Sequence, residues 1–444
     1  MPRRTAHDDP VMSRHAQEIE QLARPLETPV DLDPLLDRVG DRPYVLLGEA
    51  SHGTSEYYKW RAEITRRLIV DRGVSFIAVE GDWPDCFEVN RWVKGLVEGP
   101  ERAADVLMGF DRWPTWMWAN REVAEFLDWL RDHNSRLAMA ERVGFYGLDV
   151  YSLWESLESI LAHLAEHEPD SLDVARQAYR CFEPYGEDPQ AYAMATRLVP
   201  ASCEQDVVEM LLRLRRVESG GDDDESRLNA EQNAEVAVNA ERYYRTMVRG
   251  GAASWNVRDT HMANTLERLM GRHGAGARAV VWEHNTHIGD ARGTPMAAAG
   301  MVNLGQLARE RHGEERVVLV GFGCHEGSVM AGGSWGAPVA EMAVPPSMPG
   351  THEDLINGAS DTGCLLLFSE KVQERARIDW LGAVRGHRAI GVVYGEERTG
   401  NWVPTVMGAR YDAFCFFERT EALHPLRPEP PPRSAEFETY PFNQ

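Results

Sequence analysis

The sequence predicts an α/β protein with three layers, in which helices flank a mostly parallel, mixed central sheet. Short β-rich runs alternate with helical patterns over most of the chain, and most of these runs are continuously apolar. Strands have this composition when helices cover both faces of a sheet. In addition, a long stretch in the middle of the chain has helical spacing only, which predicts an added helical lobe.

Eight runs are expected to form the strands of the sheet. They span residues 43–49, 74–81, 143–149, 277–284, 316–323, 364–368, 389–395 and 411–418. The last two or three runs lie close together, so we expect antiparallel additions among them. Between residue 151 and about residue 264 no run has strand character, and segments such as SLWESLESILAHLAEH have helical spacing.

These patterns predict five segments along a chain of 444 residues, which is longer than one hydrophobic core usually supports. A polar, loosely attached lead-in (1–35) precedes the first part of the α/β core (36–150). A helical insertion that forms a lobe or lid (151–270) is followed by the second part of the core (271–420). The Pro-rich tail (421–444) is expected to be extended, and the polar break at 219–226 to be an exposed loop.

Composition and net charge limit the kinds of partner and the cellular compartment that we expect. A formal net charge of -23 repels phosphate backbones and anionic lipid, so nucleic acid and membrane surfaces are poor partners. No apolar stretch reaches about 18 residues, and the first ten residues lack the apolar core of a signal peptide. The cysteines form no Cys-x-x-Cys pair and are expected to be reduced and buried: Cys86, Cys181, Cys203, Cys324, Cys364 and Cys415. Together these observations predict a cytoplasmic protein, and they leave its oligomeric state open.

Polar residues with acid–base chemistry follow four of the predicted strands. Glu49 and His52 follow the first run, Glu80 ends the second, Asp149 ends the third, and EHNTH (283–287) ends the fourth. Ligands bind beyond the carboxyl ends of parallel strands, so we expect these groups to meet in one cleft. Carboxylates beside imidazoles shift each other's pKa values, which is how a general base is tuned to work near neutral pH.

Other readings of these residues stay open. A Glu after a strand can cap the next helix, and a single His there can be structural. His284 and His287 are three residues apart beside Glu283 and could hold a metal, although the His-Glu-x-x-His zinc pattern is missing. The chain also lacks a Gly-x-Ser-x-Gly elbow, which favours a base that activates water directly.

An aromatic cluster, WPTWMW (113–118), supplies candidates for the wall of a substrate pocket. Trp113 and Trp116 are our candidate substrate-binding residues, together with Asp149. The alternative is that the tryptophans only attach the helical lobe to the sheet. No cofactor is expected, because the glycines of GFGCHEG (321–327) miss the Gly-x-Gly-x-x-Gly spacing.

The segment LGEASHGTSE (47–56) resembles the signature opening of the erythromycin esterase-like family. AVEG (78–81) and WEHNTHI (282–288) resemble further elements of that family, in the same order, and the resemblance extends over about residues 40–420. This family is similar in core fold to iron-uptake proteins of the ChaN type. The resemblance implies hydrolysis of a macrolide lactone ester without a required metal.

The resemblance also implies roles for individual residues. His52 would be the general base that activates water, and Glu49, Glu80, His284 and His287 would orient it and shape the site. Arg61, in the helix after the signature, would bind a substrate oxygen or the developing oxyanion. Such groups fit the hydrolysis of an ester, which needs an activated water and stabilisation of the carbonyl oxygen.

Three hypotheses follow. The leading one is a hydrolase without a required metal, acting on a small-molecule ester or lactone such as a macrolide. The second is a metal-dependent hydrolase with His52, His284, His287 and a glutamate as ligands. The third is a binding protein, without enzymatic activity, for a small ligand or haem, and it rests on the likeness in fold to the iron-uptake proteins.

Overall fold

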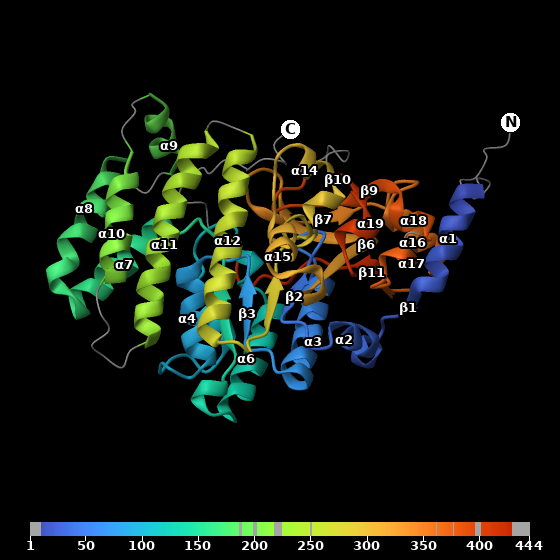
Figure 1. The fold of residues 1–444 in the computed structure, drawn as a ribbon, viewed down its shortest axis with the longest axis horizontal. Coiled ribbons are helices and arrows are strands. Elements are labelled where there is room, and N and C mark those ends of the chain that lie inside the picture. Colours follow the sequence, from blue (N-terminus) through green and yellow to red (C-terminus); the bar gives the residue numbers. More distant parts are fainter. Residues whose placement is uncertain are drawn as a thin grey trace.

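A nine-stranded mixed sheet forms the centre of the molecule, with helices on both faces (Figure 1). The computed structural model describes residues 10–185, 189–198, 202–216, 224–248, 251–360, 362–375, 377–395 and 401–428. The strand order is β1-β8-β11-β6-β2-β5-β3-β4, and β7 pairs with β6 outside this path. The predicted fold class is therefore confirmed.

The sheet is parallel at its centre and antiparallel at one side. Its strands are β1 (Ala23–Pro25), β2 (Tyr44–Leu47), β3 (Phe76–Val79), β4 (Gly144–Gly147), β5 (Ala279–Trp282), β6 (Val317–Gly332), β7 (Val339–Val344), β8 (Cys364–Leu367) and β11 (Ala413–Thr420). β2, β3, β4, β5, β6 and β11 pair in parallel, whereas β8 pairs antiparallel with β11, and β1 and β7 pair antiparallel with β8 and β6. Of the last predicted runs, 364–368 is thus an antiparallel addition and 411–418 is not.

The strand predicted at residues 389–395 is wrong. The chain forms β9 (Val384–Arg388) just before it, paired with β10 (Trp402–Val406) in a separate two-stranded sheet. Ile390 and Val393 make only isolated bridges. The run is apolar because Ile390, Val392 and Tyr394 pack into the core beside the sheet, and such packing does not require a strand ladder.

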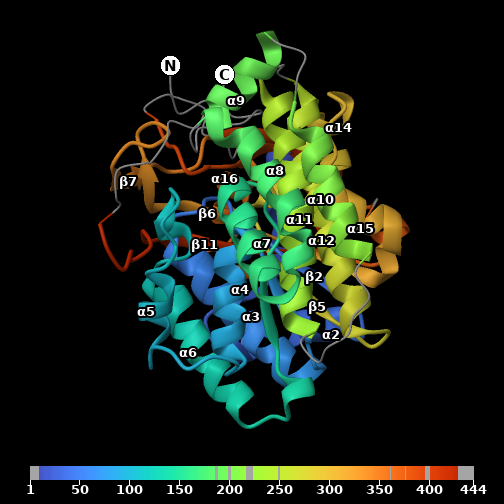
Figure 2. The same cartoon turned by 90° about the vertical axis from the view of Figure 1, so that its left-hand side faces the viewer.

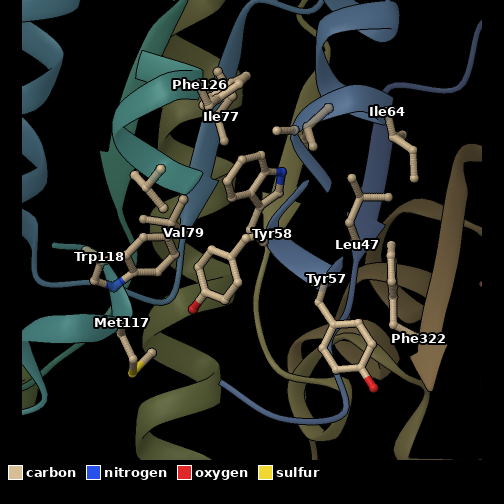
Figure 3. Close-up of a cluster of buried hydrophobic side chains, with 14 of the residues drawn as sticks. Leu47, Tyr57, Tyr58, Ile64, Ile77, Val79, Met117, Trp118, Phe126 and Phe322 are labelled. Carbon is tan, nitrogen blue, oxygen red and sulfur yellow. The ribbon is translucent and has the colours of Figure 1, made fainter. Parts of the chain in front are cut away.

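Side chains alternate between the two faces of the sheet, as the twofold repeat of a strand requires. Leu47, Val79 and Trp282 point into one core, whereas Leu46, Ala78 and Val281 point into the other. Figure 3 shows the first core, where Tyr57 and Tyr58 lie among strand side chains. Continuous apolar runs follow from this burial on both faces.

The first part of the chain supplies helices α1 to α6. They are α1 (Pro10–Leu22), α2 (Asp33–Val39), α3 (Ser55–Arg72), α4 (Trp83–Val93), α5 (Ala103–Leu107) and α6 (Arg121–Ser135). α3 and α6 cover the first core, and α3 ends where Gly73 adopts the left-handed conformation (φ 65°) that glycine tolerates. Later helices are α13 (Asn285–Ile288), α14 (Pro295–Ala298), α15 (Leu304–His312), α16 (His352–Ala359), α17 (Val372–Arg375), α18 (Asp379–Gly382) and α19 (Met407–Arg410).

Six helices between residues 153 and 273 form a lobe at the side of the sheet, seen face-on in Figure 2. They are α7 (Leu153–His167), α8 (Leu172–Phe182), α9 (Pro189–Leu198), α10 (Glu204–Arg216), α11 (Asp224–Met247) and α12 (Ala252–His273). Most of their buried side chains form a core separate from the sheet. α11 and α12 also contribute to the second core of the sheet, α11 through Leu228 and Val236 and α12 through Met262, Leu266 and Leu269. The predicted break at 219–226 lies mostly outside the described residues.

Two cysteines of the lobe correct a prediction. Cys181 and Cys203 are joined by a disulfide, whereas Cys86, Cys324, Cys364 and Cys415 are free and buried as expected. Their sequence separation of 22 residues gave no motif, because only the packing of α8 against the start of α10 brings them together. Disulfides are rare in reducing cytoplasm, so the predicted cytoplasmic location loses one of its supports. Among the described helices, none is long and apolar enough to cross a membrane.

The first and last segments that the structure describes attach to the core. In the predicted lead-in, β1 pairs with β8 and α1 packs on α16, so residues 10–25 are not loosely attached. Residues from 429 lie outside the described part of the chain. Just before them, Leu423 donates its backbone N–H to Gly53 O at 2.9 Å, and Ser55 donates to Glu421 O at 2.9 Å. Residues 421–423 therefore hold the loop between β2 and α3 in place.

Candidate active site

Four adjacent parallel strands bring the predicted polar residues to one edge of the sheet. Glu49 follows β2, Glu80 follows β3, Asp149 follows β4 and His284 follows β5, and the last residues of these strands are in register. All four side chains are buried. The structure thus brings together the groups that the sequence placed at strand ends.

His52 is oriented by Glu49. Its Nδ1 lies 2.9 Å from Glu49 Oε1, and because a carboxylate only accepts, Nδ1 carries the proton. The described residues give Nε2 no hydrogen-bond partner, and His52 lines a cavity. The loop is tight at the next residue, where a Cβ on Gly53 would lie 1.8 Å from Met330 O. The backbone of this loop is therefore fixed, and it places the unprotonated Nε2 of His52 at the cavity.

Arg61 lies behind Glu49 and not in the cavity. It is fully buried, and its Nη2 donates to Glu49 Oε2 at 2.8 Å. Its guanidinium lies over Tyr58, 4.2 Å from the ring centroid, and 5.2 Å from that of Trp282. The contact with substrate oxygen expected for Arg61 is therefore not supported, and its place is that of a positioning residue for Glu49.

Arg258, from α12, is the arginine that lies among the strand ends. It donates to both oxygens of Asp149, at 2.9 and 2.7 Å, and to Glu80 Oε1 at 2.7 Å. The other oxygen of Glu80 accepts the backbone N–H of His284 at 2.8 Å. One guanidinium thus connects the ends of β3 and β4 with a helix of the lobe.

His287 is oriented by a second carboxylate. Its Nδ1 lies 3.0 Å from Asp259 Oδ1, and its ring stacks on Trp255 with centroids 4.6 Å apart. Its Nε2 lies 3.1 Å from Arg258 Nη1 and 3.4 Å from Glu80 Oε1. His287 therefore repeats the carboxylate–imidazole arrangement of His52.

His284 lies between these two pairs. Its Nδ1 is 2.8 Å from Thr286 Oγ1, and its ring centroid is 4.9 Å from that of His52. Burial, and next the charge of His52, lower its pKa well below the ordinary value. His284 is therefore a neutral neighbour of His52.

The sequence analysis missed Trp255, Arg258 and Asp259. The sequence did contain an indication of these residues. Their positions lie on the same helix face as Met262 and Leu266, which are core residues. A charged pair on the apolar stripe of a helix must find partners inside the protein.

A cavity opens between the strand ends and the lobe. Its empty volume is about 880 Å³, including the part open to solvent. Its polar lining includes His52, Glu80, Asp149, Arg258, His284 and His287. Its apolar wall is formed by Phe110, Pro114, Met117, Trp118, Tyr151, Trp255, Trp335 and Val392. Small-molecule sites commonly combine such apolar walls with a few polar groups.

Of the three predicted substrate-binding residues, only Asp149 lines this cavity. Trp116 is buried in the first core, and Trp113 packs on Trp335 with ring centroids 4.7 Å apart. Trp118, from the same cluster, does reach the cavity wall. Part of the aromatic cluster therefore lines the cavity, whereas Trp113 and Trp116 are not among the residues of its lining.

Nearby carboxylates raise the pKa of His52. Burial alone would lower its pKa, but the charges of Glu80 and Glu49 outweigh burial and raise its pKa above 6.5. Burial would likewise raise the pKa of Glu80, but His287 and Arg258 hold it well below its ordinary value. Glu80 is therefore a permanent negative charge beside the candidate base.

The histidines do not fit a metal centre. Among the described residues, no group of three or more His, Cys, Asp or Glu side chains is arranged to hold a metal ion. The Nδ1 atoms of His52 and His287 are bound to carboxylates, and Arg258 supplies the positive charge between Glu80 and Asp149.

Fold and site together define an α/β protein with two carboxylate-bound histidines at the ends of parallel strands. Residues 69–420 match the family model of erythromycin esterase, and the chain belongs to this family. The matched residues include Glu80, Arg258 and His287, whereas Glu49 and His52 precede them.

Relatives support the same assignment. An erythromycin esterase type II from Escherichia coli is 28% identical over 120 residues, which is 27% of this chain and 26% of that protein. The chain thus matches about a quarter of that relative's length. A solved succinoglycan biosynthesis protein has a TM-score of 0.76 at 20% identity, covering 94% of this chain and 99% of its own. An erythromycin esterase mutant, EreC, in its open conformation, has a TM-score of 0.63 at 16% identity, covering 90% and 96%. At these identities the solved structures establish the fold.

Proposed function

We propose that this protein hydrolyses an ester or lactone with a water molecule activated by His52. The observation that carries this proposal is the Glu49–His52 pair, which leaves Nε2 of His52 as a proton acceptor at the wall of the cavity. Membership of the erythromycin esterase family supports this reaction type. Macrolide lactones are the first substrate class to test, because a curated relative is an erythromycin esterase.

The reaction runs in two proton transfers. Nε2 of His52 takes a proton from water while the water oxygen bonds to the carbonyl carbon. The carbonyl oxygen becomes an oxyanion, and the guanidinium of Arg258, a cation in the polar lining, stabilises it. The bond to the alcohol oxygen then breaks, and that oxygen takes the proton held by His52.

The carboxylates have separate roles in this scheme. Glu49 fixes the ring of His52 and stabilises the imidazolium that forms, and Arg61 holds Glu49 in turn. Glu80 raises the pKa of His52 and positions Arg258. His284 and His287 shape the cavity beside them. None of these roles requires a metal.

The test is mass spectrometry of macrolides and of a panel of simple esters and lactones after incubation with the protein. Wild type should add one water to at least one compound, with or without chelator. His52→Ala should lose this activity, whereas His133→Ala, which changes a histidine outside the cavity, should keep it.

Full activity of His52→Ala would refute the mechanism, and loss with chelator that a divalent ion restores would favour a metal enzyme. No turnover of any compound, combined with binding of haem seen as a Soret band, would move the assignment to a binding protein.

A further inference from the structure

A second concave region lies on the helical lobe, apart from the cavity. It is a polar groove between α4, α7 and α11 with an empty volume of about 1,560 Å³, including open solvent. No residue lines both the groove and the cavity. The scheme proposed for hydrolysis uses none of its side chains, so the groove needs its own explanation.

Two histidines of α7 share one side of this groove. The sequence HLAEH (163–167) places His163 and His167 four residues apart, which puts them on the same helix face. Their ring centroids are 4.7 Å apart and the rings are tilted by 56°. Two histidines at this spacing on one helix face are the arrangement by which helices bind zinc.

Both imidazoles are directed at one atom of another helix. Ser226 Oγ, at the start of α11, lies 3.0 Å from His163 Nδ1 and 3.5 Å from His167 Nε2. Rings that merely pack on each other need not aim ring nitrogens at a common point. Here two nitrogens and one oxygen converge, which is how ligands surround a cation.

Charges in the groove neither require nor oppose a cation. Glu225 lines the groove beside Ser226. One of its oxygens pairs with Lys94 at 2.9 Å, and the other is buried without a partner among the described residues. Glu166, Arg91 and Arg272 also line the groove, so the two carboxylates and the two guanidiniums of its lining balance. Imidazole chemistry, and not the local field, must therefore select the ligand.

We propose that His163 and His167, with the hydroxyl of Ser226, form a binding site for a borderline divalent cation such as Zn²⁺, which would tie α7 to α11. Imidazole favours Zn²⁺, Cu²⁺ and Ni²⁺, whereas Mg²⁺ and Ca²⁺ prefer carboxylate and carbonyl oxygens. The ligands that the described residues supply are the two imidazoles and the hydroxyl. Binding therefore stabilises the lobe and leaves hydrolysis at the cavity unaffected.

The test measures zinc binding and thermal unfolding of the full chain. Equilibrium dialysis against Zn²⁺ should give one site per chain in wild type, and Zn²⁺ should raise the unfolding temperature where Mg²⁺ does not. His163→Gln and His167→Gln should each weaken binding at least about tenfold, since even changes outside a metal's ligand shell cost about 10–100-fold. His133→Gln, a change to a helix histidine outside the groove, should bind as wild type does.

A competing set of histidines lies in the cavity, so His284→Gln is included as a further variant. Zinc binding that survives His167→Gln but is lost in His284→Gln would place the ion in the cavity and overturn the proposal. The absence of binding to wild type would overturn it as well. Loss in both α7 variants, with retention in His133→Gln and His284→Gln, would establish the site.

Discussion

Glu283 provides a sharp test of the electrostatics at the strand ends. Its side chain is fully buried, and neither carboxylate oxygen has a hydrogen-bond partner among the described residues. Burial, and next the charges of Glu80 and Asp259, raise its pKa well above the ordinary value of 4.5. Glu283 is therefore expected to be a neutral acid in the folded protein and an ionised one in the unfolded chain at neutral pH.

The consequence is a pH-dependent loss of stability. A carboxyl whose pKa is raised by folding contributes fully below its unfolded pKa, and the contribution is lost as pH rises toward the folded value. The loss amounts to about 1.4 kcal/mol for each pH unit in this window. Glu283→Gln keeps the shape of the neutral acid and cannot ionise, so it removes this dependence.

Urea unfolding of wild type and Glu283→Gln at a series of pH values from 5 to 8 measures the difference. The variant should differ least from wild type at the lowest pH and become increasingly the more stable protein as pH rises. Glu141→Gln, at an exposed position, should show no such trend. Parallel stability curves for wild type and Glu283→Gln would refute the assignment of a neutral Glu283.

Further predictions concern the proposed hydrolysis. Because a base must be neutral to accept a proton, kcat/KM should rise with pH through a midpoint above 6.5. Glu80→Gln should move that midpoint to lower pH. An unmoved midpoint would show that Glu80 does not raise the pKa of His52. Glu49→Gln should lower kcat about 10²–10⁴-fold, the usual contribution of acid–base catalysis, and should also lower the unfolding temperature, because it leaves the buried Arg61 without its charged partner. Arg258→Lys should lower kcat because one ammonium cannot replace contacts to Asp149 and Glu80 together; unchanged steady-state kinetics would contradict this role.

Much of the sheet and its polar edge could be predicted because both depend on local pattern. Strands buried on both faces are continuously apolar, and Glu49, Glu80 and Asp149 follow them directly in the sequence. Arg258 could not be placed in the same way. It belongs to a helix more than 100 residues from Asp149, and only the packing of α12 across the sheet brings them together.

The differences between the expected and the observed positions have the same origin. Trp113 and Trp116 were assigned to a pocket wall from residue type alone, and which tryptophan of a cluster faces a cavity depends on backbone direction. Cys181 and Cys203 were taken as reduced because spacing in the sequence does not report proximity in a helical lobe. Arg61 was expected to bind a substrate oxygen, whereas in the structure it is fully buried and its Nη2 donates to Glu49.

The attachment of residues 421–423 to the loop after β2 has a consequence for the order of synthesis. The candidate base is made early, but β5 and β6, which flank β2, follow more than 200 residues later. The segment that holds the loop follows later still. At a synthesis rate of about 5–20 residues per second, roughly 20–70 s pass between the synthesis of His52 and that of this segment. A nascent or truncated chain that ends before residue 421 is therefore expected to lack a working site.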